Sequence, residues 1–199
     1  MRAFAAALLF TLPAVAFDPF EIQVYDGTAD EKGQAGIEMH LNRHSSATHL
    51  TLEPSYGVTQ IWEIGGYLQT AQGHYQGVKL RSKFVLDLTR YRVGLNFEIS
   101  NTPSGWGGEI RPILAFENER WLLAVNPNLS FPAAFEPGAM ARIKLGPIAA
   151  GLEYYGTLPD NEHYLFETVD LISVRGLELN LGIGEGTQWV AKMILGYAF

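Results

Sequence analysis

The chain contains no cysteine, which excludes disulfide bonds and thiolate chemistry. Beyond its first 16 positions it has no run of about 18 consecutive apolar residues, so a membrane-spanning helix is also excluded. Low-complexity tracts, proline-rich linkers and sequence repeats are absent, which argues for one domain rather than a solenoid. Basic residues are outnumbered, with 14 lysines and arginines against 21 aspartates and glutamates, and this acidic balance argues against a nucleic-acid partner.

The first 16 residues have the pattern of a secretory signal. Met1-Arg2 supplies a positive start, residues 3–13 are apolar, and Ala14-Val15-Ala16 is a small-x-small cleavage site. We therefore expect the exported chain to begin at Phe17. Because no cysteine follows this site, a lipid-anchored N-terminus is not expected.

The C-terminal stretch predicts the closing strand of a transmembrane β-barrel. Every second residue back from the end is apolar or aromatic: Phe199, Tyr197, Leu195, Met193, Ala191 and Trp189. This alternation is typical of a strand with one face in lipid. The terminal Phe199, with Tyr197 two residues before it, resembles the signature that the barrel assembly machinery recognises in outer-membrane proteins. The resemblance implies that machinery as a partner and the bacterial outer membrane as the location.

Further period-two segments, separated by turn residues, predict an all-β fold: a transmembrane antiparallel β-barrel of about 12 strands with a short N-terminal extension. The segments are 35–43, 49–58, 61–71, 75–86, 91–100, 107–117, 121–130, 135–145, 148–157, 162–174, 177–184 and 189–199. An even count places both ends of the barrel chain in the periplasm. The spacing of the segments also predicts short outer loops. The division is a signal peptide at 1–16, an extension at 17–34 and the barrel at 35–199.

The extension at 17–34 is left outside this count. Its stretch Phe20 to Asp26 is strand-like, but a thirteenth strand would break the even number that bacterial barrels show. Two placements remain open: a plug inside the lumen, or a segment under the periplasmic rim. We interpret the acidic residues Asp26, Asp30 and Glu31 as a solvated turn rather than a calcium site.

Alternation also assigns the two faces of the wall. Apolar positions should face outer-membrane lipid, as in the stretches 37–41, 78–84, 91–99 and 177–183. Aromatic rings near strand ends should form girdles at the membrane interfaces: Trp62, Tyr91, Trp106, Trp121, Tyr154, Tyr164, Trp189 and Tyr197.

Charged residues of both signs fall on the inward face. The pore-lining candidates are Lys79, Arg81, Lys83, Arg92, Arg111, Arg142, Glu38, Glu53, Glu63, Glu98, Glu109, Glu153 and Glu167. Because buried charges persist only with partners, these residues are expected to pair across the bore. The network either holds a closed barrel in shape or forms the constriction of a narrow channel. Lys79, Arg81 and Lys83 make a basic stripe, which the facing glutamates should largely neutralise.

Prolines interrupt several segments, at Pro54, Pro112, Pro127 and Pro137. A proline removes a hydrogen bond from the ladder between strands, so we expect bulges or bends there. The alternative is a lateral slot in the wall through which a hydrophobic molecule leaves the lumen.

Catalytic and metal-binding patterns are sparse. His44 and Ser46 have the H-x-S spacing seen in outer-membrane lipid hydrolases, but no acidic partner can be assigned, so we expect no enzyme. His40, His49 and His163 are single positions without metal-ligand spacing, and neither a metal nor a cofactor is expected.

Several stretches resemble uncharacterised proteobacterial outer-membrane proteins similar to the transporter-like family named for the meta-pathway of phenol degradation. They are Glu21 to Gly27, Gly36 to Asn42, Leu50 to Pro54, Val78 to Phe84, Glu109 to Pro112 and His163 to Glu167. The resemblance implies a pore or facilitator for small molecules, aromatic or hydrophobic ones among them. A closed structural barrel and a lipid hydrolase are the alternatives. The sequence names no solute.

Overall fold

The computed structural model describes residues 18–131, 134–158, 160–174 and 176–199. The predicted signal at 1–16 and the predicted start at Phe17 lie outside these ranges. The described part of the chain contains no helix with the length and apolar character needed to span a bilayer.

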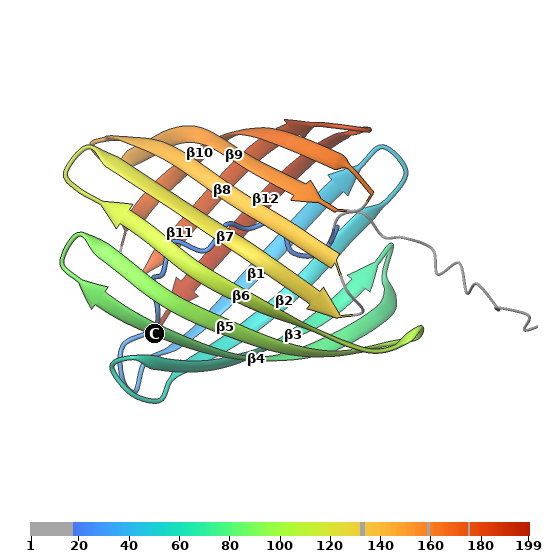
Figure 1. Cartoon of the computed structure of the whole chain (residues 1–199), viewed down its shortest axis with the longest axis horizontal. Coiled ribbons are helices and arrows are strands. Elements are labelled where there is room, and N and C mark those ends of the chain that lie inside the picture. The colour runs from blue at the N-terminus through green and yellow to red at the C-terminus, as the bar shows by residue number, and fades with distance from the viewer. Residues whose placement is uncertain (1–17, 132–133, 159, 175) are drawn as a thin grey trace, which may run out of the picture.

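Within the described residues, twelve antiparallel strands close into a barrel (Figure 1). They are β1 (Ala35–His44), β2 (Thr48–Gly57), β3 (Trp62–Ala71), β4 (His74–Leu88), β5 (Tyr91–Thr102), β6 (Gly105–Glu117), β7 (Trp121–Phe131), β8 (Ala134–Leu145), β9 (Ile148–Thr157), β10 (Glu162–Val174), β11 (Leu177–Glu185) and β12 (Trp189–Ala198). Each strand pairs with the next, and β12 pairs with β1 to close the wall. The predicted fold class is confirmed.

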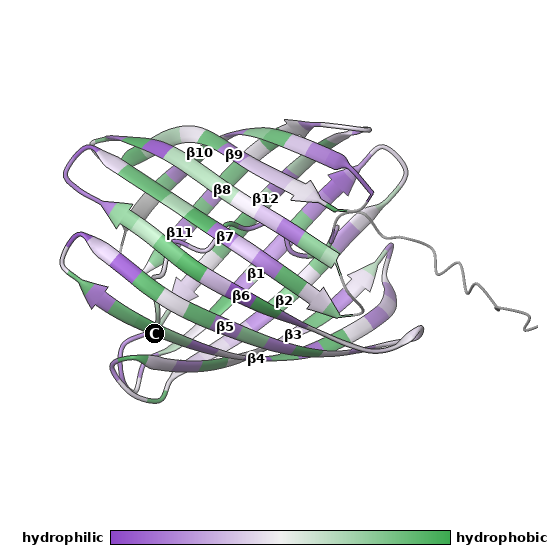
Figure 2. Ribbon diagram, in the orientation of Figure 1, coloured by the Kyte–Doolittle hydropathy of each residue, from purple (hydrophilic) through white to green (hydrophobic). Residues whose placement is uncertain are grey.

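The alternation of side chains explains why these segments form a barrel in lipid. Leu80 is 72% exposed on the outer face, while its neighbour Arg81 points inward and is 7% exposed. Figure 2 shows the same change from hydrophobic to hydrophilic residues along the strands. A closed wall has no edge strand, so its backbone groups are satisfied inside the sheet where lipid offers no hydrogen bonds.

Tight turns connect the strands where the sequence permits them. Gln72 and Gly73, between β3 and β4, have φ angles of 51° and 80°. Two consecutive left-handed residues are what a two-residue hairpin needs in order to match the twist of its strands. Glycine takes this conformation without strain, which explains its place in this turn.

The prolines interrupt the ladder without opening the wall. Pairing of β6 with β7 stops between Ile110↔Leu129 and Leu114↔Val125, beside Pro112 and Pro127. Pairing of β2 with β3 has a similar break beside Pro54. The sheet stays closed around the barrel, so these prolines act as local interruptions.

Residues 18–34 run through the inside of the barrel; we call them the luminal segment (Figure 1). At one end the Asn42 Nδ2 atom, on the inner face of β1, donates a hydrogen bond to the Pro19 carbonyl oxygen over 3.0 Å. At the other end the Gly57 amide donates to the Gln34 carbonyl oxygen over 3.0 Å, and the chain enters β1. The segment therefore crosses the bore toward the end of the barrel that carries Ala35 and Ala198, which we call the terminal end.

Two predicted positions on β10 are wrong. Tyr164 does not belong to an interface girdle, because it is buried inside the barrel and is 3% exposed. Glu167 does not line the pore: its cross-strand partners Leu152 and Ile183 are 48% and 59% exposed on the outer face. Partners directly across a ladder share a face, so Glu167 is exposed on the outside as well. The prediction equated charge with the lumen, whereas the alternation of β10 places Phe166 and Thr168 inside.

The position of Glu167 gives a test of the assigned faces. A carboxylate on a lipid-facing wall is unfavourable, so Glu167→Leu should stabilise the barrel in lipid vesicles by up to about 2 kcal/mol. Urea unfolding followed by tryptophan fluorescence measures this change. The control is Glu119→Leu in the exposed β6–β7 turn, where no gain is expected. Unchanged or lower stability of Glu167→Leu would contradict the outward placement.

Candidate functional site in the lumen

The centre of the lumen is built around a carboxylate of the luminal segment. Glu21 has a side chain with 0% exposure, and its Oε1 atom lies 2.7 Å from Arg111 Nη1 of β6. Its Oε2 atom lies 3.2 Å from Lys79 Nζ of β4, and the Tyr25 hydroxyl donates to Oε1 over 2.9 Å. A carboxylate buried without such partners would destabilise the folded state by roughly several kcal/mol. The segment thus supplies an anion to cations that the wall directs inward.

The predicted basic stripe on β4 is ion-paired along its whole length. Lys79 contacts Asp18, Glu21 and Glu98 at 2.9, 3.2 and 3.2 Å. The Arg81 guanidinium lies 2.7 Å from Glu53 and 2.5 Å from Glu63. Lys83 shares Glu63 at 3.0 Å. With every member paired, the stripe offers no continuous row of free positive charge to an anion.

A second charge cluster lies on β8, β9, β10 and β12. Glu153 accepts from Arg142 Nη2 and from Lys192 Nζ, both at 2.5 Å. Arg142 Nε lies 2.9 Å from the Asp170 carboxylate. Lys192 also donates to the Ile22 carbonyl oxygen over 3.0 Å, which ties this cluster to the luminal segment.

The remaining predicted residues lie nearer the ends of the bore. Arg92 is ion-paired with Asp26 of the luminal segment and with Glu117, and Glu117 also accepts from Lys144. Glu109 lies 2.6 Å from Arg111 Nε. All the predicted pore-lining residues except Glu167 therefore have ionic partners inside the barrel, as the ion-pair networks above and the contact of Glu38 with His40 show.

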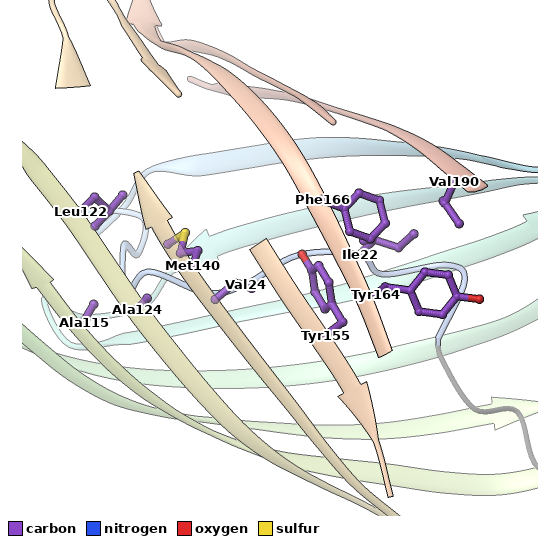
Figure 3. Packing of buried hydrophobic residues seen from close by; sticks show 10 residues of the cluster. All are labelled: Ile22, Val24, Ala115, Leu122, Ala124, Met140, Tyr155, Tyr164, Phe166 and Val190. Atoms are coloured by element: carbon purple, nitrogen blue, oxygen red, sulfur yellow. The ribbon is translucent and has the colours of Figure 1, made fainter. Parts of the chain in front are cut away.

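The lumen also contains an apolar cluster, which the sequence pattern did not predict. Ile22 and Val24 of the luminal segment pack against inward side chains of the wall (Figure 3). These wall residues are Ala115, Leu122, Ala124, Met140, Tyr155, Tyr164, Phe166 and Val190. The alternation of polar and apolar residues from Phe20 to Tyr25 could have indicated this cluster. Such a segment needs polar contacts on one face and apolar contacts on the other.

Side chains, rather than a strand ladder, hold the middle of the luminal segment. The Tyr25 amide donates to Asn126 Oδ1 over 2.6 Å, and Asn126 Nδ2 donates to the Tyr25 carbonyl oxygen over 3.0 Å. Asn126 thus satisfies both backbone groups of one residue, as a neighbouring strand would. This role was not predicted from the sequence, because no local pattern links two positions 101 residues apart.

One group of side chains in the described residues has metal-ligand geometry. Ligand atoms of Glu38, His40 and Glu53 lie within 4.8 Å of one another. The interpretation of His40 as a residue without metal-ligand spacing missed the cross-strand pair Glu38↔Glu53 two positions away. His40 Nε2 lies 3.2 Å from both carboxylates, and Arg81 already contacts Glu53, so an imidazolium satisfies this group without a metal.

The structure separates the two residues of the hydrolase pattern. His44 is 4% exposed, lies on the inner face of β1 beside His40 and Asn42, and packs edge-on against His49. Ser46 is exposed in the turn between β1 and β2. Gln188 Nε2, in the turn before β12, lies 3.2 Å from His44 Nδ1, so this ring already has a polar partner.

A cavity of about 310 Å³ remains between the luminal segment and the wall. Residues 23–28 form one side, and residues of β1, β2, β4 and β6 to β12 form the other. Lys144 and Glu178 of its lining lie close to the turns at Gly146 and Gly176, which places the cavity near the terminal end. Asp30 lies beside this end, where burial raises the pKa of its carboxyl although Ser55 donates a hydrogen bond to it.

A barrel of similar fold occurs in solved structures of outer-membrane porins and channels. The chain is similar to the KdgM porin in complex with disordered oligogalacturonate, with a TM-score of 0.69 and 12% identity over 82% of this chain and 99% of that one. An outer-membrane channel from Pseudomonas putida F1 gives a TM-score of 0.67 and 11% identity over 90% of this chain and 100% of that one. No family model and no curated protein matches the sequence. At these identities the likeness is one of fold.

The anchoring of the luminal segment can be tested with single substitutions. Glu21→Gln removes a charge from a fully buried cluster, and Asn126→Ala removes both hydrogen bonds to Tyr25. We expect each change to speed amide hydrogen exchange in residues 18–26 by about tenfold or more. Exchange in β9 should stay unchanged, because those strand pairs do not involve the segment. Exchange equal to that of the Glu119→Gln control would contradict the anchoring.

Proposed function

We propose that this chain is a narrow pore for small molecules in the bacterial outer membrane, and that the luminal segment closes its bore. The observation that carries the proposal is the way the segment is held. Residues 20–26 join no strand of the wall, and side-chain contacts fix them in a charged lumen that keeps a cavity of about 310 Å³. A segment of this kind can leave while the wall stays closed.

The outer membrane is the location that fits the wall. Large apolar side chains are exposed along the strands, and many charged side chains are buried in the lumen. A soluble barrel would need the opposite arrangement. The similar solved structures are themselves an outer-membrane channel and porins.

The choice of solute is a further part of the proposal. The oligogalacturonate is a ligand of the KdgM porin. In the present chain, Glu98, Glu53 and Glu63 neutralise the basic stripe of Lys79, Arg81 and Lys83. A strong preference for acidic sugars is therefore not expected. The resemblance to the transporter-like family named for the meta-pathway of phenol degradation favours small solutes with an apolar part, and the apolar cluster in the lumen is compatible with them.

No catalytic role is part of this proposal. Ser46 is exposed in the first turn, whereas His44 is buried on the inner face of β1. Ser46→Ala should leave any lipid turnover of the purified protein at its background level.

The test of the pore is conductance in planar lipid bilayers. A form that begins at Ala35 should show larger and more frequent current steps than the chain that begins at Phe17, because the bore is then free of residues 18–34. Silence of both forms, each with a heat-modifiable folded band on a gel, would support the closed structural barrel instead.

A disulfide can test whether the segment itself is the closure. A Cβ atom placed on Gly138 would lie 3.4 Å from Val24 Cγ2, so cysteines at both positions come within reach of a bond. The chain has no other cysteine to compete. The oxidised Val24→Cys/Gly138→Cys variant should give no current, and reduction should restore the behaviour of the unmodified chain. Equal currents in both redox states would contradict the role of the segment.

We also propose that the barrel assembly machinery recognises the C-terminal strand through Tyr197 and Phe199. Both rings are exposed, at 49% and 69%, and stack with centroids 6.1 Å apart at the end of β12. Deletion of Phe199 should lower the amount of folded barrel in cells but leave refolding from urea into detergent intact. Equal loss in both assays would indicate a purely structural role.

A further inference from the structure

The cavity at the terminal end has an unbalanced charge. The lysines and arginines in its lining are already ion-paired within the described residues: Arg81, Lys83, Arg142, Lys144 and Lys192. Glu178 has no ion pair or hydrogen bond among the described contacts and is exposed to the cavity. Every cation of the cavity lining thus has an anionic partner, whereas the carboxylate of Glu178 has no described cationic partner.

A second carboxylate lies beside it. Glu38, Gly196 and Glu178 pair in one row across β1, β12 and β11. A Cβ atom on Gly196 would lie 3.4 Å from Glu38 Cγ and 3.6 Å from Glu178 Cβ. The two acidic side chains therefore flank an open patch of backbone. The described contacts of Glu38, to His40 and Gln23, use only its Oε2 atom.

An unpaired acceptor of another kind lines the same cavity. Asn180, two residues after Glu178 on the same face of β11, is 9% exposed, and its Oδ1 atom has no donor in the described structure. Its Nδ2 atom donates to Asp170 over 2.7 Å, which fixes the orientation of the amide. A buried acceptor without a donor is unfavourable unless a ligand supplies one. A ligand that matches two carboxylates and an amide oxygen is a positively charged hydrogen-bond donor.

The rest of the lining indicates what the donor is attached to. Leu122, Ala149 and Ile194 are buried apolar residues of the same cavity. A single metal ion needs ligand atoms within about 2.6 Å of itself, so they must also lie close to one another. Among the described histidines and acidic residues, the one group with that spacing is Glu38, His40 and Glu53, and it does not include Glu178. Because buried apolar side chains line the rest of the cavity, a small organic cation fits the set better than a metal ion.

We propose that this cavity binds small primary amines, with the ammonium group held by Glu38, Glu178 and Asn180 and the apolar body against Leu122 and Ile194. The inference rests on the proposed pore function, since the cavity lies in the bore, and it names the class of solute. The ammonium donates three hydrogen bonds, which matches the three acceptors that lack a described donor: Glu38 Oε1, the Glu178 carboxylate and Asn180 Oδ1.

Calorimetric titration of the full chain in detergent tests the site directly. The probes are benzylamine, benzyl alcohol and benzoate, which share a ring and differ in charge. We expect benzylamine to bind, benzyl alcohol to bind more weakly and benzoate not to bind. Glu178→Gln and Asn180→Leu should each weaken benzylamine binding by about tenfold or more.

The matched control is Glu185→Gln, an exposed glutamate at the opposite end of the same strand, which should bind benzylamine as the unchanged chain does. A heat-modifiable band shows that each variant is folded. Benzoate binding as tight as benzylamine binding, or unchanged binding by Glu178→Gln, would overturn the inference. No amine binding together with conductance of the form starting at Ala35 leaves the pore standing without this site. Amine binding without conductance in either form leaves the site standing without the pore.

Discussion

The interior of this barrel depends on one electrostatic constraint: a charge removed from water must keep a partner of opposite sign. Arg111 and Lys79 point into the bore, and Glu21 of the luminal segment lies between them with no exposure. The wall also supplies partners, because Glu109 contacts Arg111 and Glu98 contacts Lys79. If the segment leaves, water and these two glutamates remain to solvate the cations. The same constraint that holds the segment therefore does not forbid its departure.

The luminal segment matches a lumen that offers both charged and apolar contacts. Glu21 and Tyr25 lie against charged residues, and the Arg111 guanidinium is 4.3 Å from the centre of the Tyr25 ring. Ile22 and Val24 pack in an apolar cluster with residues of β6 to β10 and β12, strands that also carry inward charges. A strand-like stretch has two faces because successive side chains point in opposite directions. This explains why an amphipathic segment fills a bore that a wholly polar or wholly apolar segment would fill poorly.

The sequence was sufficient for the wall and insufficient for what the wall encloses. Lipid strongly disfavours charged side chains, so alternation alone located the strands and the outward faces of β4 and β11. The lumen accepts both polar and apolar side chains, so hydropathy alone does not identify the inward residues. Tyr164 and Phe166 lie inside beside charged residues, whereas Glu167 lies outside. The contact of Asn126 with Tyr25 joins positions 101 residues apart, and no local pattern encodes it. The register that places Glu38 opposite Glu53 depends on how two strands pair, so it cannot be predicted from either strand alone.

The stability of the wall and the occupancy of the bore are separable in this architecture. Each strand of the described barrel pairs with a wall strand on both sides, so the ladder is complete without the luminal segment. The backbone of the segment pairs with the wall near its exit, at Gly33 and Gln34 beside Gly57, and its middle relies on side chains such as Asn126 and Glu21. Local opening is cheapest where few backbone hydrogen bonds must break. Movement that frees the bore should therefore begin in the middle of the segment, while residues 33–34 keep it attached to the wall.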